Sequence, residues 1–131
     1  MNRSFKKFIK IIAGVLIIFL ILAGAGLFYL SRGLQEGAAM EVAEVTALPE
    51  DGIYTGSHEH GRWDNKVSVT ISEGRIAEIE LIEDVRIANR DVAPQIFERV
   101  KESQSLNVDT VAGATVTSKA YLQAIADALS Y

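Results

Sequence analysis

The pattern of apolar and polar residues divides the chain into one long apolar run and a longer region of short, alternating segments. Residues 11–30 carry no charged side chain, and about 20 residues rising about 1.5 Å each match a hydrocarbon core of about 30 Å. We therefore predict a basic tail at 1–10, a transmembrane helix at 11–30 and a linker or stalk at 31–50. The rest, 51–131, is predicted to form one folded domain.

The distribution of positive charge predicts how the apolar run is oriented. Four basic residues precede the run and Arg32 follows it, the four being Arg3, Lys6, Lys7 and Lys10. The positive-inside rule then places the N-terminus in the cytoplasm and the C-terminal domain outside it, on a single-pass anchor in the cell membrane. A cleaved signal peptide is the alternative, but its apolar region normally spans about 7–15 residues and ends at small residues. Here the run continues through Leu27 to Leu30 beyond the small residues 23–26, which favours a retained anchor in the lipid bilayer.

Alternation with a period of two residues predicts strands in the first half of the domain. A short strand is expected at Ile53 to Thr55, and Val67, Val69 and Ile71 alternate with polar neighbours. A turn at 72–75, with Gly74 at positive φ, leads to a third segment in which Ala77, Ile79 and Leu81 form the apolar face. The apolar side of this small antiparallel hairpin or sheet has to be covered by other elements.

Helical periodicity later in the chain supplies that cover. Val92, Ile96, Phe97 and Val100 share one face of a helix that Asp91 or Ala93 caps, with Pro94 tolerated in its first turn. Leu122, Ile125, Ala126 and Leu129 form one stripe of a second helix, with Ser118 as its expected N-cap. The predicted fold class is therefore α+β, with a small antiparallel sheet packed by two helices and preceded by one transmembrane helix.

Composition excludes several classes of function. The region after Arg32 contains 8 basic and all 17 acidic residues of the chain, which argues against nucleic-acid binding. The chain has no cysteine, so it forms no disulfide, thiolate metal site or cysteine-ligated iron–sulfur cluster. Any redox function must therefore use a cofactor that is not held by cysteine.

The stretch from Asn107 to Ser118, just before the second helix, is the one that indicates chemistry. Ala112, Gly113 and Ala114 are small enough for a backbone turn to approach a ligand, and the helix N-terminus that follows offers unpaired N–H groups and a partial positive charge. This arrangement suits a phosphate, and the hydroxyl of Thr115 stands where such a phosphate would lie. The same letters also describe an ordinary Gly turn before a Ser/Thr-capped helix, so the pattern alone leaves both readings open.

The sequence resembles the FMN-binding domain family, which includes flavin subunits of the Rnf and sodium-pumping NADH:quinone oxidoreductase complexes and small exported flavoproteins. The residues Asp109-Thr110-Val111-Ala112-Gly113-Ala114-Thr115 are similar to the attachment motif D-x-x-[ST]-G-A-T of that family. The resemblance also covers the segments 51–56, 67–76 and 117–120, and extends from about Asp51 to Leu129. Ala112 departs from the family pattern, which has Ser or Thr there.

This resemblance implies a role for each residue of the motif. Thr115 would carry FMN through a phosphoester formed by a separate flavin transferase, which uses FAD and magnesium and releases AMP, and Asp109 would serve recognition or activation by that transferase. Gly113 and Ala114 would form the cofactor-binding turn, and Thr117 and Ser118 are the neighbouring hydroxyls of the site. The implied function is that of an electron carrier and not of an enzyme by itself. A membrane reductase or quinol would donate electrons, and an exported redox acceptor would receive them.

Two other functions remain open at this stage. A flavin-free extracytoplasmic binding or interaction module is the first, and the Ala112 departure is its support. A metal-binding module at His58 and His60 is the second, although an H-x-H pair supplies only two imidazoles, and we expect no dedicated metal site. Trp63, Arg62, Arg86 and Arg90 are candidates for bordering a flavin ring, against the simpler readings of core packing and solvated charge.

Overall fold

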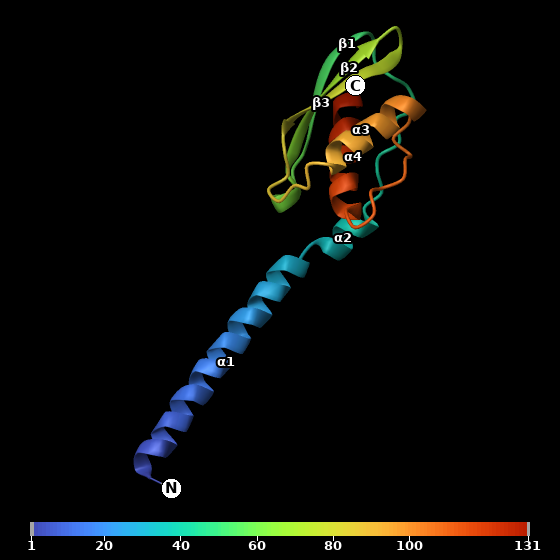
Figure 1. Cartoon of the computed structure of the whole chain (residues 1–131). Coiled ribbons are helices and arrows are strands. Elements are labelled where there is room, and N and C mark those ends of the chain that lie inside the picture. Colours follow the sequence, from blue (N-terminus) through green and yellow to red (C-terminus); the bar gives the residue numbers. More distant parts are fainter. Residues whose placement is uncertain (1, 131) are drawn as a thin grey trace. The chain divides into compact units, whose positions relative to one another are not determined.

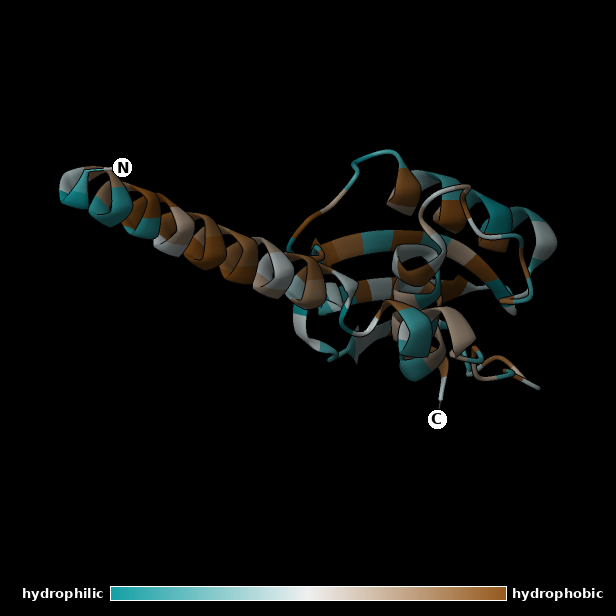
Figure 2. Cartoon of the chain, turned by 90° about the horizontal axis from the view of Figure 1, so that it is seen from below, coloured by the Kyte–Doolittle hydropathy of each residue, from teal (hydrophilic) through white to brown (hydrophobic). Residues whose placement is uncertain are grey.

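The computed structural model describes residues 2–130 and divides into two compact units, residues 1–35 and 36–131. In the first unit, helix α1 (Arg3–Ser31) contains the predicted span and continues through the basic residues before it. None of its residues is buried, and its ribbon is hydrophilic near the N-terminus and mostly hydrophobic beyond it (Figure 2). It is the one helix among the described residues that is long and apolar enough to cross a membrane.

The second unit contains a three-stranded antiparallel sheet in the order β1-β2-β3. Its strands are β1 (Gly52–His58), β2 (Asn65–Ser72) and β3 (Arg75–Glu83), with the short 3-10 helix η1 (Gly61–Trp63) between the first two. Helices α3 (Val92–Ser103) and α4 (Thr115–Leu129) contact the sheet, α4 against β1 and β2 and α3 against β3 (Figure 1). The predicted α+β fold class is confirmed.

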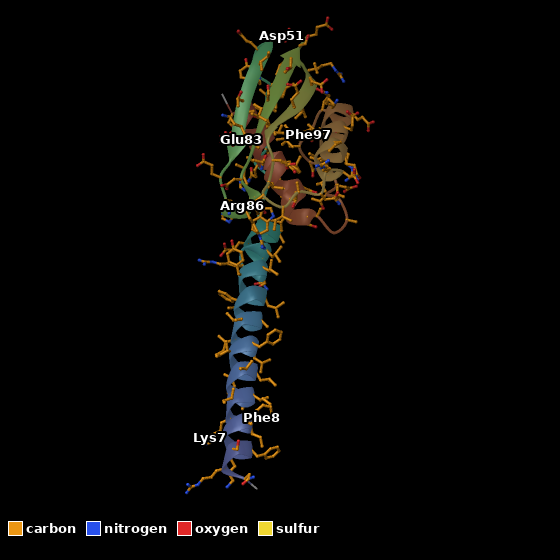
Figure 3. All side chains as sticks on the ribbon, turned by 60° about the vertical axis from the view of Figure 1, so that its left-hand side comes forward. Lys7, Phe8, Asp51, Glu83, Arg86 and Phe97 are labelled. Atoms are coloured by element: carbon orange, nitrogen blue, oxygen red, sulfur yellow. The ribbon has the colours of Figure 1, made fainter. Side chains whose placement is uncertain are left out.

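The predicted apolar faces meet in a single core. Val67, Val69 and Ile71 of β2 are buried, as are the four predicted residues of α3 and the four of α4. Phe97 of α3, labelled in Figure 3, meets Tyr121 of α4 edge to face, with ring centroids 5.9 Å apart.

In the third predicted strand, Ile79 is buried and Leu81 packs against the core as predicted, but Ala77 does not face the core. Ile76 pairs with Ile71, while Glu78 pairs with Thr70, so Ala77 is an additional residue in β3 and is exposed. Such a β-bulge shifts the side-chain alternation by one position. The prediction that Ala77 faces the core is therefore wrong, and Ile76 takes its place.

The turn between β2 and β3 is a two-residue turn with positive φ at both Glu73 and Gly74 (55° and 70°). Asp51, just before β1, accepts hydrogen bonds from the N–H groups of Glu73 (2.8 Å) and Gly74 (3.0 Å). These bonds hold the pKa of Asp51 below its usual value, with the bond from Gly74 the larger cause. The carboxylate of Asp51 thus connects the start of β1 to the turn between β2 and β3.

The segment between Glu36 and Pro49, predicted as part of a stalk, belongs to the second compact unit. Its first residues, 36–39, are the later part of α2 (Leu34–Ala39), and the rest has no regular structure. Val42, Val45 and Leu48 pack against the hydrophobic core. We call residues 36–48 the docked linker.

Candidate functional site

The predicted attachment motif forms an open turn directly before α4. The N–H of Ala114 donates to the carbonyl of Val111 (2.9 Å), and Gly113 has φ of +77°. A side chain at Gly113 would meet no atom within 4 Å, and Ala112 is exposed as well. The left-handed conformation favours glycine, and the empty space beside it leaves the backbone open to a ligand.

Thr115 is the first residue of α4 and its side chain is exposed. Because α-helical hydrogen bonds run back by four residues, the N–H groups of Thr115, Val116 and Thr117 have no helical partner. Within residues 2–130 no side chain caps this end, since Ala114 occupies the N-cap position. A hydroxyl, a partial positive charge and unpaired N–H donors therefore lie together, and this set fits an esterified phosphate.

The prediction that Ser118 caps the helix is wrong, because α4 begins three residues earlier. Ser118 is fully buried; its Oγ donates to the carbonyl of Ala114 (2.7 Å) and accepts from the N–H of Val111 (3.0 Å). The hydroxyl thus links the turn at 111–114, which lies in the predicted attachment motif, to the first turn of α4. Thr117 is half-buried, so Thr115 is the most accessible of the three hydroxyls.

Asp109 lies in the exposed loop that leads into this turn. Its backbone carbonyl accepts a hydrogen bond from the guanidinium of Arg99 (2.5 Å), which links the loop to α3. The structure thus brings Asp109, Gly113, Ala114 and Thr115 onto one exposed loop and helix start. Their roles in binding FMN stay predictions.

The docked linker lies along the first turns of α4, which the sequence did not predict. A Cβ at Gly37 would be 2.4 Å from Cγ1 of Val116, so backbone and side chain are in close contact there. The ammonium of Lys119 donates to the carbonyl of Ala38 (2.5 Å). Further on, the amide of Gln123 donates to the carbonyl of Glu41 (2.9 Å) and accepts from the N–H of Ala43 (3.4 Å).

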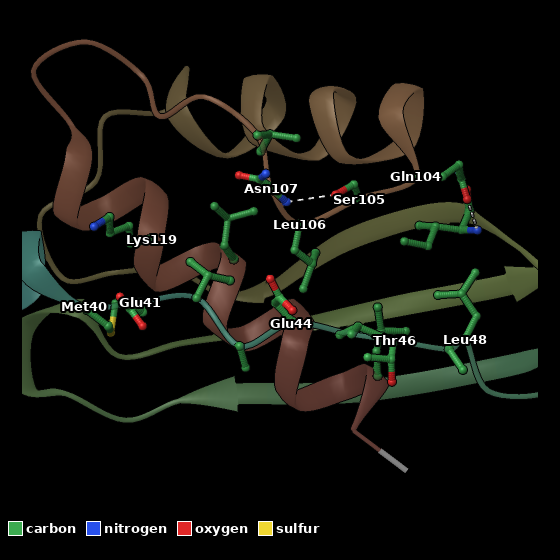
Figure 4. A pocket seen from close by; sticks show the side chains of 18 of the residues that line it. Met40, Glu41, Glu44, Thr46, Leu48, Gln104, Ser105, Leu106, Asn107 and Lys119 are labelled. Carbon is green, nitrogen blue, oxygen red and sulfur yellow. Dashed lines mark hydrogen bonds between the residues drawn. The ribbon is translucent and has the colours of Figure 1, made fainter.

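A groove of about 1140 Å³ runs between the docked linker and the loop after α3, with Lys119, Leu122 and Leu129 of α4 among its lining residues. Lys119, Met40 and Glu41 lie at one end of this groove, and Gln104 and Leu48 lie at the other (Figure 4). At its end of the groove, the side chain of Gln104 accepts a hydrogen bond from the N–H of Ile76 (2.8 Å) and donates one to the carbonyl of Ile76 (3.0 Å).

The H-x-H segment ends β1 and does not form a larger ligand set. The rings of His58 and His60 are stacked with centroids 5.9 Å apart. Burial, and next the charge of His60, lower the pKa of His58, while Asp64 acts in the opposite direction. Throughout residues 2–130 there is no group of three or more His, Asp or Glu side chains placed to hold a metal ion.

The other residues considered as borders of a flavin ring come from two neighbouring loops. The guanidinium of Arg62 lies 4.3 Å from the ring centroid of Trp63, a cation–π contact, and Trp63 is buried. The N–H of Arg86 donates to the carbonyl of Arg62 (3.1 Å) and joins the two loops. Arg86 and Asp51 lie at opposite ends of the domain (Figure 3), and Arg90 is exposed.

In the part of the chain that the structure describes, Asn65 Oδ1, beside Trp63, is the buried side-chain atom without a hydrogen-bond partner.

Comparison with known proteins connects this site to a cofactor. Residues 61–130 match the family described as the FMN-binding domain, a match that contains β2, β3, α3, the attachment turn and α4. The chain is also 29% identical over 103 residues to an NADH:acrylate oxidoreductase from Vibrio harveyi, an alignment that covers 76% of this chain. The chain spans about 10% of the length of that relative. The matched residues cover more than half of the chain and include the whole turn and helix described above, and so this protein belongs to the FMN-binding domain family.

Proposed function

We propose that the protein is a membrane-anchored, extracytoplasmic electron carrier in which FMN is bonded covalently to Thr115. The observation that carries this proposal is the exposed Thr115 hydroxyl at the uncapped start of α4, directly after the open turn at Gly113. FMN supplies the redox chemistry, and the protein binds and places it.

The attachment step is a phosphoryl transfer carried out by a separate flavin transferase. A bond forms between Thr115 Oγ and the phosphorus of the FMN half of FAD, and the pyrophosphate bond of FAD breaks, so that AMP leaves. The hydroxyl proton passes to a base of the transferase. Asp109, exposed on the approach to the turn, is the residue proposed to be recognised by that enzyme or to assist it.

The departure at Ala112 does not remove a structural element of the turn. Its side chain is exposed, so the methyl group leaves neither a cavity nor a buried polar group without a partner. The turn is held instead by Ser118 and by the bond between Ala114 and Val111. The turn that the proposed attachment needs is therefore retained despite the departure at Ala112.

A tethered cofactor suits a carrier that works outside the cytoplasm, because a covalent bond keeps the flavin at high effective concentration where free FMN would be diluted. Electrons would come from a membrane reductase or quinol and pass to an exported acceptor. The oxidoreductase in the name of the Vibrio harveyi relative supports a redox role for the shared domain.

Labelling of the full-length chain tests the proposal. The chain is coexpressed with a flavin transferase, and flavin fluorescence of the denatured gel band is compared between wild type, Thr115→Ala and the matched control Thr117→Ala. We expect fluorescence in wild type and Thr117→Ala and none in Thr115→Ala, with peptide mass spectrometry locating the adduct. A flavin peptide recovered from folded Thr115→Ala would refute the assignment.

The orientation needs a separate test, because labelling alone does not reveal the side of the membrane. A reporter that is active only outside the cytoplasm is fused after the last residue of the chain. Activity is expected because four basic residues precede the apolar run at 11–30. Activity of a reporter that works only inside the cytoplasm would contradict the proposed orientation.

A further inference from the structure

Lys119 is a cation that the packing of the core does not account for, and the resemblance over 117–120 assigns it no role. It lies on α4, one helical turn after Thr115, and its ammonium is fixed by the carbonyl of Ala38 (2.5 Å). The ion pairs found among residues 2–130 all involve Lys101, so Lys119 has no carboxylate partner within that range. The ammonium is thus held in place without being neutralised.

The geometry of a helix directs this ammonium toward the attachment residue. Residues four apart lie about 40° from each other around the axis, with Cβ atoms about 5–6 Å apart. Helical side chains also lean toward the N-terminus, so a lysine at position 119 can reach the turn that begins at Thr115. Thr115 is exposed, so no other described side chain covers it fully.

The charges around Lys119 favour a role in binding an anion. Glu41 and Glu44 line the same groove as Lys119, and the region after Arg32 carries 8 basic against 17 acidic residues. A phosphate esterified at Thr115 would add another negative charge, and the helix N-terminus opposes it with only about half of an elementary charge. A full positive charge within one helical turn would therefore add to what the helix N-terminus supplies and favour the anion further.

We propose that Lys119 binds the phosphate of FMN on Thr115 while it also holds the docked linker. An ammonium has three N–H donors; the carbonyl of Ala38 takes one, which leaves two for phosphate oxygens. The docked linker, which lies outside the matched region 61–130, becomes part of the cofactor site through this residue. This inference rests on the proposed attachment of FMN at Thr115.

The test compares Lys119→Met, Lys119→Arg and the matched control Gln123→Met in the full-length chain in detergent micelles. Methionine removes the charge of Lys119 and keeps an unbranched stem. Gln123→Met removes the two other hydrogen bonds between α4 and the linker, and no charge. The readouts are the initial rate of labelling by a flavin transferase and the ³¹P resonance of the protein-bound FMN.

We expect Lys119→Met to lower the labelling rate about fivefold and to move the ³¹P resonance. Lys119→Arg should restore both, and Gln123→Met should leave both near wild type. If Lys119→Met takes up no flavin, restoration of labelling by Lys119→Arg supports the proposal, and failure to restore it overturns the proposal.

Two further results would also overturn the inference. One is a ³¹P resonance and labelling rate that are the same in wild type and Lys119→Met. The other is a Gln123→Met variant that reproduces the changes of Lys119→Met, because docking of the linker would then be the cause. A wild-type chain that carries no adduct at Thr115 would instead refute the proposed function itself, so the two failures are distinguishable.

Discussion

Replacing Gly56 by alanine should destabilise the domain strongly, because β1 and α4 touch through their backbones at this residue. A Cβ at Gly56 would lie 2.1 Å from the carbonyl oxygen of Ala124, 2.2 Å from the backbone nitrogen of Ala128 and 2.8 Å from its Cα. Ordinary contacts between such atoms begin at about 3.5 Å. A backbone atom cannot rotate away as a side chain can, so β1 and α4 would have to separate by more than about 1 Å.

The size of the effect follows from two opposing terms. Overpacking costs about 1–3 kcal/mol, and contact with backbone on three atoms places Gly56→Ala at or above the upper end of that range. The loss of chain entropy in the unfolded state offsets about 0.4–1 kcal/mol. We expect a net loss of roughly 2–3 kcal/mol in the free energy of unfolding, or a melting temperature lower by about 10–20 °C.

Gly52→Ala is the matched control, in the same strand. The atoms nearest to its Cβ would belong to the side chain of Tyr54, at 3.6–3.7 Å, which is an ordinary contact. Urea unfolding of the full-length chain in detergent micelles, followed through the fluorescence of Trp63, the single and buried tryptophan, measures both variants. Equal urea midpoints for Gly56→Ala and Gly52→Ala would refute the close approach of β1 and α4.

Three further predictions concern hydrogen bonds and titration. Tyr121→Phe removes the bond from the phenol to Asp84 Oδ1 (2.5 Å) and should cost about 1–2 kcal/mol at neutral pH by urea unfolding. Burial, and next the bond to Asp84, raise the pKa of Tyr121. The free energy of unfolding of the wild type should therefore fall as pH rises above the ordinary tyrosine pKa of 10.0. In Tyr121→Phe this part of the loss of stability at alkaline pH should disappear. The pKa of Asp51 is lowered, so its contribution is present above pH 3.8 and is lost as pH falls through the folded value; Asp51→Asn should flatten the acid limb of thermal unfolding measured by circular dichroism. The lowered pKa of His58 makes stability fall as pH drops below 6.5, and a His58→Gln variant whose stability has the same slope between about pH 5 and 6.5 would contradict this.

Periodicity predicted the elements whose packing is local in sequence and strongly patterned. The faces of α3 and α4, and that of β2, contain the residues that are buried, because each stripe had to turn toward a single core. The positive φ at Gly74 was predictable as well, since a two-residue hairpin turn requires it.

Features that depend on contacts across the chain were not predictable from the pattern. The bulge at Ala77 is set by how β3 pairs with β2, and a single strand does not reveal its pairing register. The docking of residues 36–48 rests on bonds between residues about 80 positions apart, from Ala38 to Lys119 and from Glu41 to Gln123. Ser118 looked like a cap because serine favours that position, but its hydroxyl bonds backward to Ala114 inside the helix.

The order of the elements along the chain has a consequence for when the domain can fold during synthesis. The three strands are consecutive, but the helix that covers β1 and β2 is α4, the last element described. The bond from the N–H of Ser57 to Asp127 joins residues 70 positions apart. Until residues 115–129 have been synthesised, β1 and β2 lack the helix that covers them, and the core stays incomplete. Because Thr115 is the first residue of that same helix, the proposed attachment site would form in the step that completes the core.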